Sequence, residues 1–135
     1  MIKAQPTITI ANKSNQSLEG AKLLFENKSY DSAVSRAYFA CYQYALVALH
    51  QHKNELYPIC DARKHNHRSI TGAFSRYLIK EDNIYPNEIK GYLKELQEHR
   101  HTADYEPAYS YDKKEAEAIL KKAVHFCNTL KSKLD

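Results

Sequence analysis

The sequence predicts an all-α protein whose helices form an up-and-down bundle with short connections. Three glycines and four prolines among 135 residues leave little material for the turns of a β-sandwich or barrel. Apolar residues recur every three to four positions through most of the chain, as in helices with one buried face. The length fits one domain, which we place at residues 14–135 after an N-terminal arm at residues 1–13.

The first half of the chain predicts an arm and two helices. Polar and apolar residues alternate from Thr7 to Ile10, which favours an extended arm. A first helix is expected at about residues 13–27, followed by a break at residues 27–29. The second helix, at about 31–51, is apolar nearly all round and should therefore be central. Arg36 is its only charge between residues 33 and 49, which makes that arginine unusual.

The second half predicts three more helices. A loop with Pro58 precedes a third helix that carries Ile70 and Phe74 on one face. Pro86 is expected to open a fourth helix, since proline suits the first helical turn. Asp112 followed by Glu115 has the spacing of a capping box and predicts the start of the fifth helix.

Cysteine usage and hydropathy exclude two protein classes. The three cysteines are widely spaced and form no CxxC motif, so no disulfide framework is expected. The longest uncharged stretch, residues 37–49, is shorter than the roughly 20 residues that span a bilayer. No basic-then-apolar leader precedes a small-residue cleavage site. We therefore expect a cytoplasmic protein with reduced thiols and no membrane segment.

The formal net charge of +4 is unevenly distributed. Between residues 63 and 80 the chain carries five basic residues and no acid, and two histidines lie within the same run. Residues 81–106 carry seven acids against three basic residues. A one-sided basic segment permits a nucleic-acid partner, but a solvated helix face is an equally good interpretation.

Arg100 is the leading candidate for a functional residue. The apolar row of the fourth helix, Leu93 and Leu96, continues onto Arg100 instead of a hydrophobic residue, and Asp104 follows one turn later. An arginine on a buried stripe needs a partner. A structural pair with Asp104 and a functional arginine are both consistent with this spacing. His99 and His101 flank Arg100 and should point away from it, into solvent.

The sequence provides no cofactor or metal motif. His65 and His67 lack a cysteine or acid at ligand spacing, so no metal site is expected. No Gly-rich phosphate loop, HExxH or GxSxG is present, which removes support for common NTPases, zinc proteases and serine hydrolases. Tyrosines at positions 105, 109 and 111 could stack on bases or pack the bundle end.

Three motifs resemble those of the small prokaryotic HEPN domains. Ser35-Arg36-Ala37-Tyr38-Phe39-Ala40 is similar to the family's "sRaYYA" signature. His67, followed by Phe74 seven residues later, resembles "H-x-G-V-x-x-x-F". The run from Leu96 through Arg100 to Ala103-Asp104-Tyr105 resembles "L-x-x-x-R-x-x-A-D-Y". The order and spacing agree over about residues 14–134.

The resemblance implies a bundle of four to five helices that dimerises. HEPN proteins often act in toxin–antitoxin or other defence modules, frequently beside a minimal nucleotidyltransferase, and many are metal-independent ribonucleases. Their motif, an arginine and then a histidine after four to six residues, implies a role for Arg100. The histidine is missing here: Tyr105, Glu106 and Pro107 stand at the matching positions. No general base for a 2′-hydroxyl is therefore evident.

Two functions follow from these observations. The first is a HEPN component of a toxin–antitoxin or defence module that binds RNA or nucleotide, with degenerate ribonuclease activity. The second is a non-catalytic subunit that holds a nucleotidyltransferase or another partner. Arg100, Asp104 and Tyr105 are the candidate catalytic residues. The candidate RNA- or nucleotide-binding residues are Arg36, Arg63, Lys64, His67 and Arg68.

Overall fold

The computed structural model describes residues 6–53 and 67–134, and every regular element in these two stretches is helical. The α-helices are α1 (Pro6–Glu26), α2 (Tyr30–His52), α3 (His67–Ala73), α4 (Tyr92–Tyr105) and α5 (Lys113–Lys131). A π-helix, η2 (Phe74–Glu81), continues α3, and a short 3-10 turn, η3 (Asn87–Ile89), precedes α4. The prediction of an all-α bundle is confirmed.

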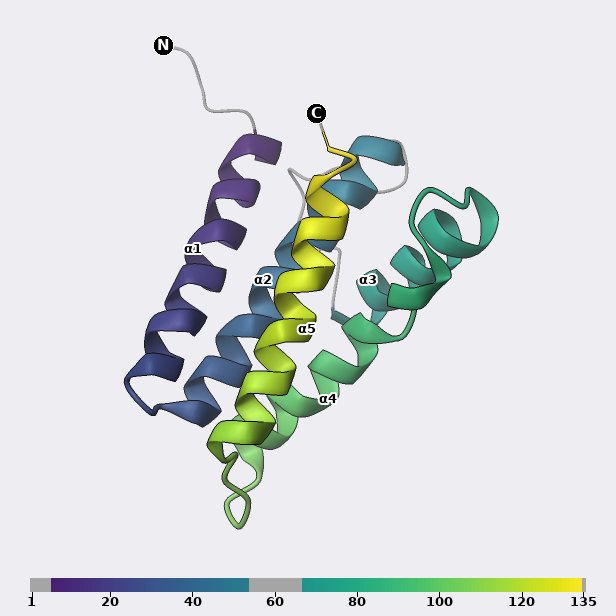
Figure 1. Ribbon diagram of the computed structural model, residues 1–135. Helices are drawn as coiled ribbons and strands as arrows, with labels where there is room; N and C mark the ends of the chain where they lie inside the picture. Colours follow the sequence, from purple (N-terminus) through teal and green to yellow (C-terminus); the bar gives the residue numbers. More distant parts are fainter. Residues whose placement is uncertain (1–5, 54–66, 135) are drawn as a thin grey trace.

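Helix α2 lies at the centre of the bundle, as its sequence predicts. Figure 1 shows α1, α2 and α5 running alongside one another, and α2 also packs against α3 and α4. Eleven residues of α2 are buried, including Ala37, Tyr38 and Cys41. The many alanines among them allow close approach of the neighbouring helices. The described helices therefore share one core.

The expected extended arm is wrong for residues 6–13, because α1 already begins at Pro6. Proline is tolerated in the first turn of a helix. Ser14 and Ser17 then anchor α1 to α2: the Ser14 hydroxyl donates to the Ala40 carbonyl at 2.7 Å, and Ser17 lies 3.0 Å from the Gln43 amide. Packing on α2 thus outweighs the weak strand preference of the Thr-Ile alternation. Residues 1–5 lie outside the described part.

The break predicted at residues 27–29 is confirmed, and its geometry is that of a helix C-terminal cap. Lys28 has a positive φ of 64°, and the Ser29 amide donates to the Leu24 carbonyl at 2.8 Å. The left-handed conformation of Lys28 and the hydrogen bond from Ser29 back to Leu24 end α1 and turn the chain into α2.

The fourth helix starts later than the sequence predicts. Pro86 has an extended ψ of 148° and precedes η3, and α4 begins only at Tyr92. Gly91 lies between the two segments, where its low helix propensity favours the break. The capping box of α5 is confirmed: Asp112 accepts from the Glu115 amide, and the Glu115 side chain accepts from the Asp112 amide.

An aromatic cluster joins η2 to the rest of the core. Phe74 stacks on Tyr85 with ring centroids 5.8 Å apart and lies 5.4 Å from Phe126 of α5. All three side chains are almost completely buried. Cys41 and Cys127 are free thiols in the same core, with sulfur atoms 3.9 Å apart. Cys60 lies outside the described residues.

No helix in the described stretches combines the length and apolar character needed to cross a membrane.

Candidate functional site

The beginning of α2 meets the end of α4 in a cluster that brings two of the sequence motifs together. The Ser35 hydroxyl donates to Asp104 Oδ2 at 3.1 Å, although the two residues are 69 positions apart. The same carboxylate oxygen lies 3.1 Å from Arg100 Nε. Asp104 therefore links the "sRaYYA" segment to the arginine of the third motif.

Arg100 is held between two aromatic rings. Its guanidinium carbon lies 5.2 Å from the centroid of Phe39 and 5.4 Å from that of Tyr105. The Arg100 side chain is 23% exposed, so the rings and the ion pair cover most of it. Cation–π contacts of this kind stabilise a charge that has lost much of its water.

The ion pair leaves the Arg100 guanidinium incompletely satisfied. The Nε atom is buried and close to Asp104, but its N–H bond is not directed at that oxygen. No other described residue accepts a hydrogen bond from Nε. Buried polar hydrogens are normally satisfied, so this Nε–H is an exception. Arg100 and Asp104 are thus paired, as one interpretation of the sequence predicts. The pair lacks the two parallel N–H···O hydrogen bonds of a strong arginine–carboxylate interaction.

Arg36 joins the cluster through the same phenylalanine. Its guanidinium carbon lies 5.1 Å from the Phe39 ring centroid, and its side chain is exposed. Two positively charged guanidinium groups therefore lie over one ring, whereas the cluster contains one negative charge, the carboxylate of Asp104. The cluster has an excess of positive charge at the surface, which attracts an anion such as a phosphate.

Tyr38 is a buried core residue that interacts electrostatically with Arg100 of the cluster. Burial raises the pKa of the Tyr38 hydroxyl well above its usual range, and the neighbouring Tyr42 raises it further. The positive charge of Arg100 acts in the opposite direction. A tyrosine hydroxyl is protonated at physiological pH even at its usual pKa, and burial moves Tyr38 further from ionisation, so Tyr38 is neutral beside the arginine.

His101, which the sequence predicts to be exposed and outside the site, lies on the same surface as the cluster. The His101 ring lies 5.0 Å from the Tyr105 ring, which in turn covers Arg100. His101 is exposed, as predicted, and Tyr105 is 60% exposed. The helical spacing of four residues between His101 and Tyr105 is the signal that could have found this contact.

The expected exposure of His99 is wrong. His99 is half-buried, and its Nδ1 lies 2.8 Å from the Tyr111 hydroxyl. These two residues line a hollow of about 210 Å³ between α4 and α5 with Glu95, whose carboxylate lies 2.8 Å from Lys122 Nζ. Burial raises the pKa of Tyr111, the one buried member of the tyrosine-rich loop at 105–111. This part of the loop packs the bundle end.

The structure places only part of the predicted basic segment. Arg63 and Lys64 lie outside the described residues, as do the side chains of His67 and Arg68 at the start of α3. Arg76 is exposed, with its Nε 3.3 Å from Glu81 Oε1. Among the described residues, no three histidine, cysteine, aspartate or glutamate side chains gather where they could hold a metal ion.

The motif residues that meet in this cluster point to one family, and comparison with known proteins decides it. A family model of the HEPN domain matches residues 9–133. The chain belongs to the HEPN family. A protein of Methanocaldococcus jannaschii named "Putative toxin MJ0142" is 33% identical over 125 residues, covering 93% of this chain and 79% of the relative. A second, "Putative toxin MJ0605" of the same organism, is 33% identical over 128 residues, covering 90% of this HEPN chain and 83% of the relative.

Proposed function

We propose that this HEPN protein is the toxin of a toxin–antitoxin module and that it engages RNA through the cluster of Ser35, Arg36, Phe39, Arg100, Asp104 and Tyr105. The names of both relatives support the toxin role. The single observation that carries the RNA-binding role is Arg100, a guanidinium that is held between two aromatic rings and keeps 23% of its side chain exposed beside one carboxylate. A phosphate oxygen is the acceptor that a guanidinium in this state is suited to bind.

The neighbouring residues support the same proposal. Arg36 adds a second positive charge beside Phe39, and the exposed rings of Tyr105 and His101 offer surfaces on which a base can stack. The six cluster residues include no histidine, the usual general base in RNA cleavage, and this absence supports a degenerate ribonuclease activity. The His101 ring contacts Tyr105 of the cluster, so we propose that any residual cleavage uses this imidazole.

Growth arrest in a bacterial host tests the toxin role. Inducing the wild-type chain is expected to stop growth, and Arg100→Ala is expected to relieve the arrest at equal protein levels. Lys94→Ala is the matched control, because Lys94 is an exposed cation on the same helix, α4, but lies outside both the cluster and the basic segment at residues 63–80. Normal growth with the wild-type chain, or arrest by Arg100→Ala at full strength, contradicts the proposal.

We further propose that two copies assemble through the face of α2 next to the cluster. Phe39, Tyr42 and Leu46 follow one another at helical spacing there and are only half-buried. A stable interface of this kind buries upwards of about 1,000 Å². Light scattering is expected to give twice the chain mass of 15.6 kDa at micromolar concentration. A particle of one chain mass at that concentration contradicts the proposal.

The basic segment at residues 63–80 is proposed to follow the RNA backbone. Each phosphate contact on a single strand contributes about −0.7 to the slope of log affinity against log salt. Reversing the charges of Arg63, Lys64 and Arg68 is expected to flatten that slope by about 2 and to weaken binding at low salt, with unchanged helical circular dichroism. Unchanged affinity in the triple variant contradicts this role.

A second function is favoured by the contacts of Asp104. This carboxylate accepts from Ser35 and pairs with Arg100, so it ties α2 to α4 and could simply shape a surface for a minimal nucleotidyltransferase. In that case Ser35→Ala and Arg100→Ala should weaken binding of such a partner equally and leave RNA affinity unchanged. The proposed RNA role requires the opposite: Arg100→Ala lowers RNA affinity more than Ser35→Ala does.

A further inference from the structure

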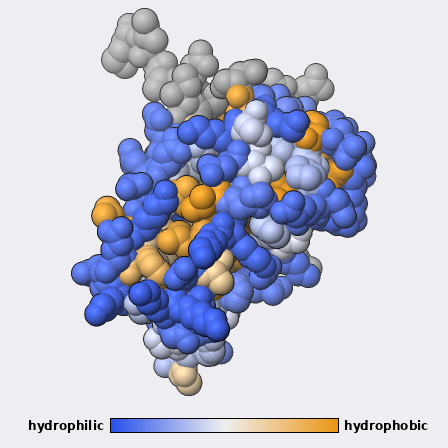
Figure 2. Space-filling model, in the orientation of Figure 1, coloured by the Kyte–Doolittle hydropathy of each residue, from blue (hydrophilic) through white to orange (hydrophobic). Residues whose placement is uncertain are grey.

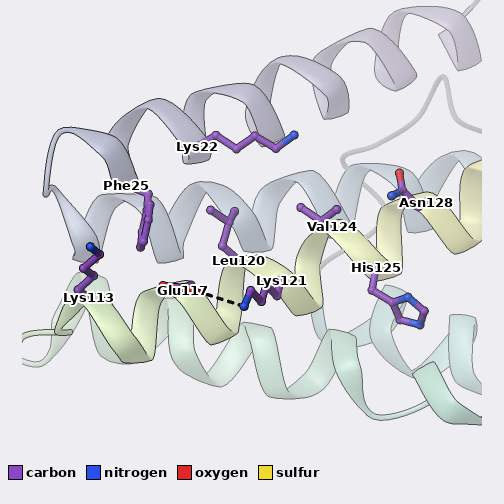
Figure 3. A pocket seen from close by; sticks show the side chains of 9 residues that line it. All are labelled: Lys22, Phe25, Lys113, Glu117, Leu120, Lys121, Val124, His125 and Asn128. Atoms are coloured by element: carbon purple, nitrogen blue, oxygen red, sulfur yellow. Dashed lines mark ion pairs between the residues drawn. The ribbon is translucent and has the colours of Figure 1, made fainter.

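A groove of about 700 Å³ runs between α1 and α5, on residues that play no part in the Arg100 cluster. Figure 3 shows Lys22 and Phe25 projecting from α1 and a row of side chains from α5, including Leu120 and Val124. Helix α2 passes behind the groove. The volume is in the range of natural binding pockets.

The floor of the groove is apolar and open to solvent. Phe25, Leu120 and Val124 line it, and each is only half-buried. Figure 2 shows hydrophobic residues gathered between α1 and α5, surrounded by hydrophilic ones. A contiguous apolar patch with a polar rim is typical of a surface that binds another molecule.

The rim of the groove is positively charged. Lys22, Lys113 and Lys121 stand on it against a single acid, Glu117. Lys121 Nζ lies 3.2 Å from Glu117 Oε1, so that acid is already neutralised. Neither Lys22 nor Lys113 forms an ion pair with any described residue. Two exposed ammonium groups, one on each wall, therefore lack an acidic partner within the part of the chain that the structure describes.

We propose that this groove docks an acidic amphipathic helix of a partner protein. The apolar residues of such a helix, spaced i, i+3, i+4 and i+7, would cover Phe25, Leu120 and Val124, as in other helix-in-groove complexes. Aspartates or glutamates on its flanks would pair with Lys22 on one wall and Lys113 on the other. This inference does not depend on the RNA role of the Arg100 cluster, because the two sites share no residue.

The charges favour this occupant over two others. A second copy of this chain placed by a two-fold axis would set two net-positive rims against each other and add like-charge repulsion. A nucleic acid needs a continuous basic track with ring faces for its bases. Here Glu117 interrupts the lysines, the floor is mainly aliphatic, and the Phe25 ring already packs 5.6 Å from Tyr30.

Fluorescence anisotropy with three labelled probes tests the proposal on the full chain. The first probe is a peptide of about 15 residues with leucines at helix-in-groove spacing and glutamates on both flanks. The second has the same composition in scrambled order, and the third is a single-stranded RNA. The amphipathic peptide is expected to bind, and the scrambled peptide to bind at least about tenfold more weakly, because only the first can place its leucines on one face.

Reversing the charge of the two rim lysines tests whether the peptide binds in this groove. Lys22→Glu/Lys113→Glu is expected to weaken the amphipathic peptide about tenfold, because both flanking attractions become repulsions. Lys13→Glu/Lys114→Glu is the matched control, since it changes one exposed lysine on each of the same two helices outside the groove. Val124→Ser, at the floor, should weaken binding without changing the charge.

The proposal is overturned if the amphipathic peptide does not bind, or if the scrambled peptide binds equally well. It is also overturned if the control variant loses as much peptide affinity as the Lys22/Lys113 variant, or if the Lys22/Lys113 variant loses affinity for RNA instead of for the peptide. The last outcome would assign the groove to nucleic acid. Loss of RNA binding on Arg100→Ala with unchanged peptide binding would separate the two sites.

Discussion

Arg100→Ala is expected to weaken the binding of a single-stranded RNA of about 15 nucleotides by at least about tenfold. The substitution removes the partly exposed cation that lies between Phe39 and Tyr105. A charge-assisted hydrogen bond contributes about 1.5–3 kcal/mol, which corresponds to this loss or more. Fluorescence anisotropy at low salt, with the labelled RNA as probe, measures the change directly.

Two variants distinguish a lost RNA contact from a damaged fold. Arg100→Lys keeps the charge but not the planar fork, so it should retain the melting temperature and recover only part of the affinity. Lys94→Ala removes an exposed cation from the same helix outside both the cluster and the basic segment, and this variant should bind RNA as the wild type does. Full RNA affinity in Arg100→Ala contradicts the proposed role.

The stability cost of Arg100→Ala should be small, about 1 kcal/mol or less, because both members of the ion pair remain partly exposed. Asp104 also keeps its hydrogen bond from Ser35 after the substitution. A loss of several kcal/mol that Asp104→Ala reverses in the double variant would mark the pair as a structural device.

Phe74→Ala is expected to have the largest effect on stability, about 3–5 kcal/mol in the free energy of unfolding. The substitution leaves a cavity between Tyr85 and Phe126 at the centre of the core. Because Phe74 is also the first residue of η2, the loss should weaken the packing of this π-helix on α2 and α5. Urea denaturation followed by circular dichroism measures the change.

Phe74→Leu and Tyr105→Ala are the controls for this experiment. Leucine restores most of the apolar volume and should recover a large part of the stability. Tyr105 is 60% exposed, so its truncation should change the free energy of unfolding by no more than about 0.5 kcal/mol. A Phe74→Ala protein that unfolds at the same urea concentration as the wild type would show that this cluster does not hold the fold together.

The helical fold could be predicted because its signals are local. The apolar row of each helix, the break at residues 27–29 and the capping box of Asp112 and Glu115 involve residues within a few positions of one another. Such patterns are governed by the 3.6-residue period and by unpaired amides at helix ends, and both can be read from a single chain. The central position of α2 follows in the same way from its apolar circumference.

Two helix starts could not be predicted from local signals. The Thr-Ile alternation after Pro6 suggests an extended arm, but Ser14 and Ser17 bind α2 and draw the whole segment into α1. Pro86 fits a helix start, but the chain first forms η3, and Tyr85 anchors it by donating to the Leu130 carbonyl at 3.4 Å. At the start of α1, contacts with distant residues outweigh a local preference of a few tenths of a kcal/mol. At the start of α4, the contact of Tyr85 acts together with the low helix propensity of Gly91.

In the candidate site, too, some features follow from local sequence and others from contacts between distant residues. The sequence by itself determined that Arg100 interrupts an apolar row, that Asp104 lies one turn away, and that both belong to a HEPN-like motif. Only the tertiary structure decided that Ser35 and Phe39 complete the site, that Tyr105 and Phe39 enclose the guanidinium, and that α1 and α5 leave a lysine-rimmed groove. The reason is physical: spacing along one helix specifies a face, whereas the residues that meet that face depend on how helices far apart in the chain pack together.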